Sequence, residues 1–401
     1  MAVVDHTQTS PAWIDDFPDL DGTHYLNVGT LALVPSPVMQ RYLAYFEEWN
    51  RLGAGDPLHY QGWRERVECT RTSLAEYCGI SSADSLHLTS SVSDALNLAI
   101  FGWQIAPGAA VITSDQEHPA LVAPLTHLYQ TGHPISVIAY GSGGDAFLDR
   151  LQRALEQSPT PVGMVAVSHV SHMTGALIDA QAVAALCDHF GARLLLDGAQ
   201  AFGQVPMKPG LAADAYVLNG QKWGLAPVGN AALYVRPDRL PTWNPPLHGP
   251  SDGFWTHYPQ SLEGGWTAHR RRLEYGTRSW PTWMAWCDAL AYRASWPPLT
   301  FEHHASALAR ALKQALVRRS RITLFSRLDT PTATVSFAVE GINNQQLSDH
   351  LRKFRIVHRI IGAPLHAVRL TFGPSNRADA LTQVAAALDA LQGTETGGQE
   401  K

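Results

Sequence analysis

The sequence of 401 residues predicts an α/β protein with a large, doubly wound, mostly parallel sheet domain and a small C-terminal α/β domain. Short apolar runs alternate with helical periodicity between about residues 86 and 235, and polar turns follow several of these runs. A second, shorter set of strand and helix patterns begins at residue 322. Because a chain of this length exceeds one ordinary hydrophobic core, two domains are expected.

The first elements precede the main sheet. Residues 1–20 are polar with scattered Pro and predict an N-terminal arm. The run at 25–30 predicts a strand that enters a Gly turn. Helical patterns follow at 37–49 and 64–77, and Gly79 is the expected C-cap of the second helix.

The strands of the large sheet are predicted from apolar stretches bounded by turn residues. These stretches lie at 86–89, 111–114, 135–139, 164–168, 193–197, 215–218 and 230–235. Residues 90–93 separate the first of these strands from a helix, where free backbone N–H groups and the helix dipole favour an anion. A plain Ser N-cap without a ligand is the alternative.

Asp197 and Lys222 carry the strongest chemical signal. Asp197 ends a buried apolar strand, where an unpaired charge is costly, so it is expected to face a cation. Lys222 lies in the polar turn after the next strand, and the carboxyl ends of strands in an open α/β sheet border one crevice. A lysine for a Schiff base and a carboxylate for a protonated pyridine nitrogen are the groups that pyridoxal 5′-phosphate (PLP) requires, so the sequence predicts this cofactor.

The second half of the chain changes in pattern. Residues 240–265 are rich in Pro, Gly, Trp and His and predict a long loop near the crevice. Helices are expected to about residue 318, and a small α/β unit with a closing helix at 376–392 follows. We therefore expect four parts: an arm at 1–20, a large PLP-binding domain at 21–265, a small C-terminal domain with connecting helices at 266–393, and a polar tail at 394–401.

Composition and charge exclude several classes of function. A net charge of −5 and a pI of about 6.4 argue against nucleic acid as a partner. Four cysteines without CxxC spacing predict buried thiols in a reducing cytoplasm. Since no apolar run is long enough for a membrane span and no signal-peptide pattern opens the chain, a cytoplasmic protein without membrane contact is expected. The 18 histidines show no HExxH or Cys–His ligand spacing, so no metal site is expected.

Across about residues 20–390 the chain resembles the class V aminotransferase family of fold-type I PLP enzymes, and within it the isopenicillin N epimerase-like and cyst(e)ine C–S lyase-like members. The motifs that carry the resemblance are Thr-Ser-Ser-Val-Ser-Asp at 89–94, Glu-His-Pro at 117–119, Asp-Gly-Ala-Gln at 197–200, Asn-Gly-Gln-Lys-Trp at 219–223, Glu-Tyr-Gly-Thr at 274–277 and Val-Arg-Leu-Thr at 368–371. The resemblance implies that Lys222 binds PLP covalently and that Asp197 pairs with the pyridine nitrogen.

The same resemblance implies further cofactor contacts. Val92 and Ser93 match the phosphate-binding turn, and Gln221 stands where many relatives place a His that reaches the phosphate. Gln200 is expected to donate to O3′ of the cofactor, and His118 to stack on its ring. Thr277 resembles a residue that relatives extend to the phosphate of the neighbouring subunit, which implies a homodimer.

Substrate contacts are implied at four other positions. Arg369 matches the anchor of the α-carboxylate, Arg359 resembles a second anchor found in lyase-like members, and Asn27 is expected to contact the substrate. His172 stands where relatives often carry Asn, and we expect it to act in catalysis by stacking, hydrogen bonding or proton transfer. A structural role for this histidine is the alternative.

The resemblance implies a PLP-dependent C–S lyase that performs β-elimination on a cysteine or a cysteine S-conjugate, giving a thiol, pyruvate and ammonia. The alternatives are an aminotransferase or an isopenicillin N epimerase-like epimerase on an amino-acid metabolite, and decarboxylation or oxidative deamination of a cysteine conjugate. Persulfide-forming cysteine desulfurases need a nucleophilic Cys in the C-terminal domain, and no Cys follows Cys287, which disfavours that activity. A purely regulatory PLP-fold protein is opposed by the presence of Lys222, Asp197 and Arg369.

Overall fold

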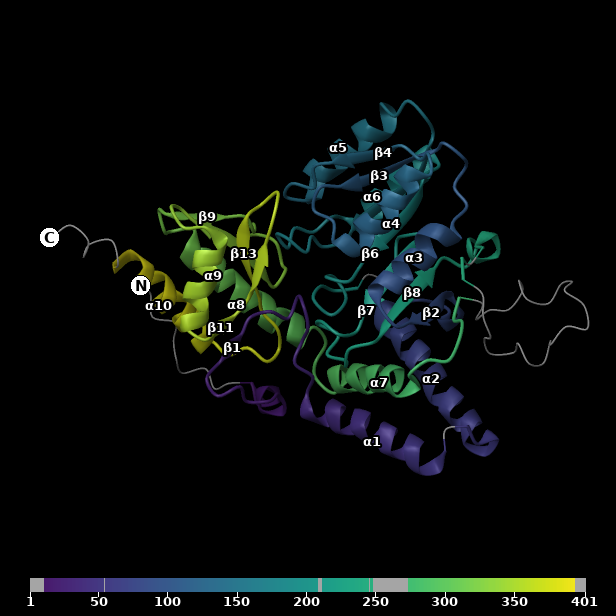
Figure 1. Cartoon of the computed structure of the whole chain (residues 1–401), viewed down its shortest axis with the longest axis horizontal. Coiled ribbons are helices and arrows are strands. Elements are labelled where there is room, and N and C mark those ends of the chain that lie inside the picture. Colours follow the sequence, from purple (N-terminus) through teal and green to yellow (C-terminus); the bar gives the residue numbers. More distant parts are fainter. Residues whose placement is uncertain (1–10, 54, 208–210, 245, 248–272, 394–401) are drawn as a thin grey trace, which may run out of the picture.

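The computed structural model describes residues 11–53, 55–207, 211–244, 246–247 and 273–393. A large sheet flanked by helices and a smaller C-terminal sheet are separate in Figure 1. The first half of the expected arm, most of the expected loop at 240–265 and the tail at 394–401 lie outside the described residues.

The large sheet contains seven strands in the order β2-β8-β7-β6-β5-β3-β4. The strands are β2 (Leu86–Thr89), β3 (Ala110–Ser114), β4 (Ile135–Ile138), β5 (Val162–Ser168), β6 (Arg193–Asp197), β7 (Ala215–Asn219) and β8 (Ala231–Val235). Strands β3 to β7 pair in parallel, whereas β8 pairs antiparallel with both β7 and β2. This confirms the expected doubly wound, mostly parallel sheet and adds one antiparallel strand.

Helices cover both faces of this sheet (Figure 1). They are α1 (Ser36–Leu52), α2 (Pro57–Cys78), α3 (Val92–Gly102), α4 (Pro119–Gln130), α5 (Gly144–Glu156), α6 (Ala180–Phe190) and α7 (Trp280–Ala294). Along β6, Leu194 and Leu196 join the hydrophobic core that contains α1, α2 and α5 to α7, while Leu195 joins the core that contains α3 and α4. The alternation follows from the two-residue period of a strand, and burial on both faces explains why β6 is apolar throughout.

The C-terminal unit is built on a four-stranded sheet in the order β12-β13-β10-β9. Its strands are β9 (Ile322–Leu324), β10 (Thr334–Val339), β12 (Arg359–Ile361) and β13 (Ala367–Thr371), and its helices are α8 (Thr300–Leu316), α9 (Asn344–Lys353) and α10 (Asp379–Gly393). A two-stranded sheet joins β1 (His24–Tyr25) to β11 (Ile356–Val357), so the start of the chain is tied to this unit. Short 3₁₀ helices lie at Ala12–Asp16, Ala83–Ser85 and Leu240–Thr242.

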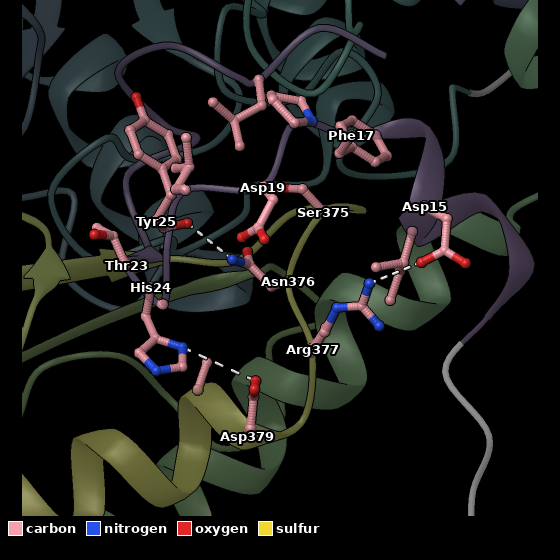
Figure 2. A pocket seen from close by; sticks show the side chains of 16 residues that line it. Asp15, Phe17, Asp19, Thr23, His24, Tyr25, Ser375, Asn376, Arg377 and Asp379 are labelled. Carbon is pink, nitrogen blue, oxygen red and sulfur yellow. Dashed lines mark hydrogen bonds and ion pairs between the residues drawn. The ribbon is translucent and has the colours of Figure 1, made fainter. Parts of the chain in front are cut away.

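The N-terminal segment also borders a hollow of about 520 Å³ beside the start of α10 (Figure 2). Asn376 donates from Nδ2 to the Tyr25 carbonyl at 2.8 Å. Arg377 donates to Asp15 at 2.8 Å, so this residue ties the N-terminal segment to the turn before α10.

The expectation that all four cysteines are buried is wrong for Cys69, which is exposed on α2, and for Cys287 on α7, which is half-buried. Their sulfur atoms lie 3.4 Å apart. Cys78 and Cys187 are buried as expected. In the described part of the chain, no helix is both long and apolar enough to span a membrane.

Candidate active site

The carboxyl ends of β3, β5, β6 and β7 lie at one edge of the large sheet, because these strands run in parallel. Asp197 is the last residue of β6, and the segments that follow β3, β5 and β7 carry His118, His172 and Lys222. A cavity of about 620 Å³ opens at this edge. All but two of the residues predicted for the site line it: Val92, Ser93, His118, His172, Asp197, Gln200, Gln221, Lys222, Arg359 and Arg369.

The two exceptions are Asn27 and Thr277, which are not among the described residues that line the cavity. Asn27 accepts a hydrogen bond from the hydroxyl group of Thr30 at 2.8 Å, and Thr30 does line the cavity. Thr277 belongs to the turn before α7. On either side of it, Tyr275 donates to Asp94 at 3.3 Å and Arg278 donates to Ser90 at 3.4 Å, so this turn lies beside the start of α3.

Glycines that directly follow β6 and β7 allow tight turns at the ends of these strands. A Cβ atom on Gly198 would lie 2.0 Å from the ring of Tyr216, and a Cβ atom on Gly220 would lie 2.1 Å from Oδ1 of Asn230. Since these distances are too short for any side chain, only glycine fits the turns that aim Asp197 and Lys222 at the cavity.

The electrostatics of Asp197 and Lys222 are coupled. Burial lowers the pKa of Lys222 to about 8, an effect that Arg369 reinforces and Asp197 opposes. Burial raises the pKa of Asp197, while a hydrogen bond from the backbone N–H of Ala199, at 2.8 Å, and the nearby Lys222 lower it. The lysine and the carboxylate therefore face the same cavity and stabilise each other's charged form.

Two histidines stand close together in the cavity. The rings of His118 and His172 are 5.2 Å apart and nearly perpendicular. Burial lowers the pKa of His118 to about 4 and that of His172 to about 3, and the cations Lys222 and Arg369 add to both shifts. His118 Nδ1 accepts the backbone N–H of Ala120 at 3.1 Å and so caps α4. Both rings are therefore uncharged at neutral pH.

His172 has a defined tautomer in this arrangement. Its Nδ1 lies 3.1 Å from the carbonyl oxygen of Gln116, which can only accept, so Nδ1 carries the ring proton. This leaves Nε2 of His172 as a hydrogen-bond acceptor.

Arg359 and Arg369 bring positive charge to the cavity from neighbouring strands. The two residues face each other across the antiparallel pair of β12 and β13. Arg369 is only 3% exposed, and it donates to the carbonyl oxygen of His172 at 2.6 Å and to Thr30 at 3.2 Å. Its Nε has no partner among the described residues. Burial and Arg359 lower the pKa of Arg369 to about 10, so this guanidinium group would be stabilised by a bound anion.

The start of α3 offers a second place for an anion. Ser91 is the N-cap, and its Oγ accepts the backbone N–H of Asp94 at 3.0 Å. The first N–H groups of a helix lack helical partners and carry a partial positive charge, and Val92 and Ser93 at this end line the cavity.

Gln200 and Gln221 line the cavity but are engaged elsewhere. Gln200 donates to the carbonyl oxygen of Gly29 at 3.0 Å, and Gln221 accepts the backbone N–H of Gly229 at 3.3 Å. Gln200 Oε1 and Gln221 Nε2 take no part in these two hydrogen bonds.

Glu117 is a lining residue to which the sequence alone assigned no role. Its carboxylate is buried among the ends of β3 and β5, although it stands in a polar turn of the kind that usually places a carboxylate in solvent. A role for Glu117 could have been inferred from its place next to His118, at the end of a strand whose neighbours also end in polar residues. No group of three or more His, Cys, Asp or Glu residues in the described ranges is arranged to hold a metal ion.

Comparisons with known proteins identify the family and the fold. The family model described as aminotransferase class-V matches residues 24–367. A probable cysteine desulfurase of Methanothermobacter thermautotrophicus is 27% identical over 225 residues, which are 56% of this chain and 55% of that protein. This chain therefore spans about half the length of that curated relative.

Two solved structures share the fold over most of the chain. One is the complex of the cystine C–S lyase C-DES with its reaction product cysteine persulfide, with a TM-score of 0.83 and 22% identity, covering 93% of this chain and 98% of that one. The other is a C-DES mutant with glycine covalently linked to its PLP cofactor, with a TM-score of 0.82 and 20% identity at the same coverage. These likenesses confirm the fold-type I architecture.

Proposed function

This chain belongs to the aminotransferase class-V family of PLP-dependent enzymes, and we propose that it is a C–S lyase that eliminates a thiol from cysteine or a cysteine S-conjugate. The observation that carries the proposal is the single cavity in which Lys222 and Asp197 meet Arg359 and Arg369. An amine of lowered pKa, a buried acid and a site for a carboxylate are the groups that such chemistry on an amino acid requires.

The described residues fit PLP. Lys222 would hold the cofactor through its amine, and Asp197 would hold the proton on the pyridine nitrogen. The phosphate would lie at the N–H groups of Val92 and Ser93, where the first turn of α3 favours an anion. The uncharged His118 would offer the cofactor ring a flat, aromatic neighbour.

Lys222 is the proton carrier in this proposal. When bound, PLP supplies an aldehyde that takes up the substrate amine and a ring that accepts the electron pair released at Cα. Once the substrate amine has replaced it on the cofactor, the freed Nζ of Lys222 would take the proton from Cα and return a proton to the departing sulfur. The bond between Cβ and sulfur breaks with its electron pair on the sulfur, and water releases the remaining fragment as pyruvate and ammonia.

The two arginines select the substrate. Arg369, which is held by His172 and Thr30, is rigid enough to bind the α-carboxylate through two parallel hydrogen bonds and so to orient the Cα–H bond. Arg359 is exposed at the same cavity and is placed for a second carboxylate of a larger conjugate such as cystine. His172 Nε2, as a free acceptor, would contact the substrate amine or its departing group.

The cysteine content favours a lyase over a persulfide-forming desulfurase. A desulfurase passes sulfur to a Cys of its own small domain, and the last Cys of this chain is Cys287 on α7. Cys287 packs against α2 with its sulfur next to that of Cys69 and does not line the cavity. The sulfur is therefore released into solution with the product.

We also propose that the chain forms a homodimer. Leu43, Phe46 and Leu58, on α1 and the start of α2, are 54%, 44% and 86% exposed, which is unusual for large apolar side chains on one region of a monomer. Thr277 does not line its own cavity, consistent with a role at the site of a second copy.

The reaction is tested with purified protein, PLP and S-methylcysteine or cystine. The proposal expects pyruvate and ammonia in equal amounts, together with one thiol or persulfide per turnover. Formation of a keto acid that keeps the sulfur would identify an aminotransferase, and accumulation of the D-isomer an epimerase. Either outcome, without pyruvate, would refute the lyase while leaving PLP dependence intact.

A further inference from the structure

The carboxylate of Glu117 joins two strand ends beside the cavity. Glu117 follows β3 and is only 4% exposed. Its Oε2 accepts the backbone N–H of Ser168 at 2.9 Å and also the Ser168 hydroxyl, while Oε1 accepts the hydroxyl of Ser114. Ser114 and Ser168 are the last residues of β3 and β5, so one side chain connects the ends of two neighbouring strands.

This connection lies directly next to Asp197. Ser168 and Asp197 are paired in register across β5 and β6. Glu117 also directly precedes His118, whose position depends on the turn that Glu117 fixes. The carboxylate of Glu117 therefore supports both Asp197 and His118, which are expected to contact the cofactor.

We propose that Glu117 is a positioning residue for the cofactor site: its buried carboxylate holds His118 and Asp197 in place and adds negative charge behind Asp197, which strengthens binding of PLP with a protonated ring nitrogen. This inference rests on the proposed PLP dependence and assigns to Glu117 no contact with the substrate.

The groups that face Glu117 determine when it is charged. Burial raises its pKa to about 7, the three hydrogen bonds from Ser114 and Ser168 oppose the rise, and Asp197 adds to it. Burial raises the pKa of Tyr140 well above its usual value and the charge of Glu117 adds to the rise, so Tyr140, whose hydroxyl group donates to the carbonyl oxygens of Ser168 and His169, stays protonated. Glu117 therefore changes from neutral to charged near pH 7, while at Asp197 the nearby Lys222 opposes the rise in pKa that burial causes.

The test compares PLP binding by wild-type, E117Q and D214N apoproteins at pH 6 and pH 8, measured by tryptophan fluorescence. Glutamine keeps the size of Glu117 but removes its charge. At pH 8 the Kd for PLP should rise about tenfold in E117Q, because a charge-assisted bond is lost. At pH 6 the difference should shrink, since the wild-type carboxyl group is then protonated. Asp214, a buried acid paired with Arg236 and Arg239 at the opposite end of the sheet from the cavity, is the control whose loss should leave the Kd unchanged at both pH values.

Equal Kd values for wild type and E117Q at both pH values would overturn the inference, and so would a ratio that is the same at pH 6 and pH 8. If E117Q does not fold, S168A tests the inference instead. This variant keeps the charge of Glu117 and the hydrogen bond from the backbone N–H of residue 168, and it removes the hydroxyl donor of Ser168. It should weaken PLP binding severalfold, and an unchanged Kd would again overturn the inference. Wild-type protein that does not bind PLP at all would instead refute the proposed function.

Discussion

Lys222 and Lys313 are both lysines whose pKa burial lowers to about 8, and of the two only Lys222 lines the cavity of about 620 Å³. Lys313 on α8 donates to the carbonyl oxygens of Thr330 and Thr332 at 3.2 and 3.3 Å, so its ammonium group is satisfied inside the C-terminal unit. Lys222 shares its cavity with Asp197. A lowered lysine pKa thus reports burial in both places, and the shared cavity is what distinguishes the reactive lysine.

The rate at which Lys222 captures PLP should follow its lowered pKa. Only the unprotonated amine attacks an aldehyde, so the rate constant for capture by the apoprotein should rise with pH and reach half its maximum near pH 8. Stopped-flow absorbance over pH 6 to 10 measures this rate. Lys222→Ala is the control and should show no capture. A midpoint near 10.5, the usual pKa of a lysine, would show that Lys222 is not desolvated as the structure has it.

Replacing Arg369 with Lys should weaken substrate binding while the protein stays folded. Lysine keeps the positive charge but loses the paired hydrogen bonds of the guanidinium group, which corresponds to about 10- to 100-fold in kcat/KM for a charged partner. Steady-state pyruvate release measures the effect. Arg377→Lys, at an exposed position outside the cavity, is the matched control and should behave as wild type. An unchanged kcat/KM for Arg369→Lys would remove this residue as the carboxylate anchor.

At the level of elements, the strands of the large sheet could be predicted because each is an apolar run bounded by turn residues. The strand β8 was expected, but its direction was not. The segment between β7 and β8 holds the Lys222 turn and no helix, and a parallel return needs about a dozen or more residues and usually a helix. The antiparallel pairing of β8 follows from that short connection.

Short strands escaped prediction, and one of them matters for the site. β12 has three residues and β11 has two, too few for a period-two pattern to stand out. Pairing of β12 with β13 is what sets Arg359 opposite Arg369. The family resemblance predicted both arginines as anchors for substrate carboxylates. Their direct pairing across β12 and β13 could be seen only in the fold.

The turn before α10 should owe its stability to Asn376 rather than to Arg377. Asn376 is buried, accepts the N–H of Gly373 at 2.7 Å and donates to Tyr25, so Asn376→Ala leaves two backbone groups unpaired and should cost about 2 kcal/mol or more. Arg377 and Asp15 form an exposed ion pair, and Arg377→Ala should cost less than about 1 kcal/mol. Urea unfolding measures both changes. A larger loss for Arg377→Ala would mean that the ion pair, and not the buried amide, holds the N-terminal segment.

The whole molecule places its candidate site between two hydrophobic cores. Lys222 follows β7 of the large sheet, whereas the next residue, Trp223, is buried in the core of the C-terminal unit and donates to the carbonyl oxygen of Phe372 at 2.8 Å. Arg369 enters from the small sheet. The sequence could predict that these residues serve one function, but not that Trp223 anchors the lysine turn to the second core, because a single Trp carries no periodic signal.

The exposed apolar side chains of α1 should be covered by a second copy of the chain. Phe46→Glu is expected to reduce the mass in solution from twice 43.8 kDa to 43.8 kDa, because it places a charge in the proposed interface. Light scattering after size exclusion measures the mass. Val317→Glu, at a residue of similar exposure after α8, is the control and should remain dimeric. A wild-type protein that is monomeric at micromolar concentration would contradict the dimer.

The most direct measurement is the site at which PLP becomes attached. Purified protein is loaded with PLP, reduced with borohydride so that the attachment becomes permanent, digested and examined by mass spectrometry. We expect that one of the five lysines, Lys222, carries the label, that Lys313 does not despite its similar pKa, and that Lys222→Ala carries none. A label on another lysine, or no label at all, would mean that Lys222 and Asp197 do not form a PLP site.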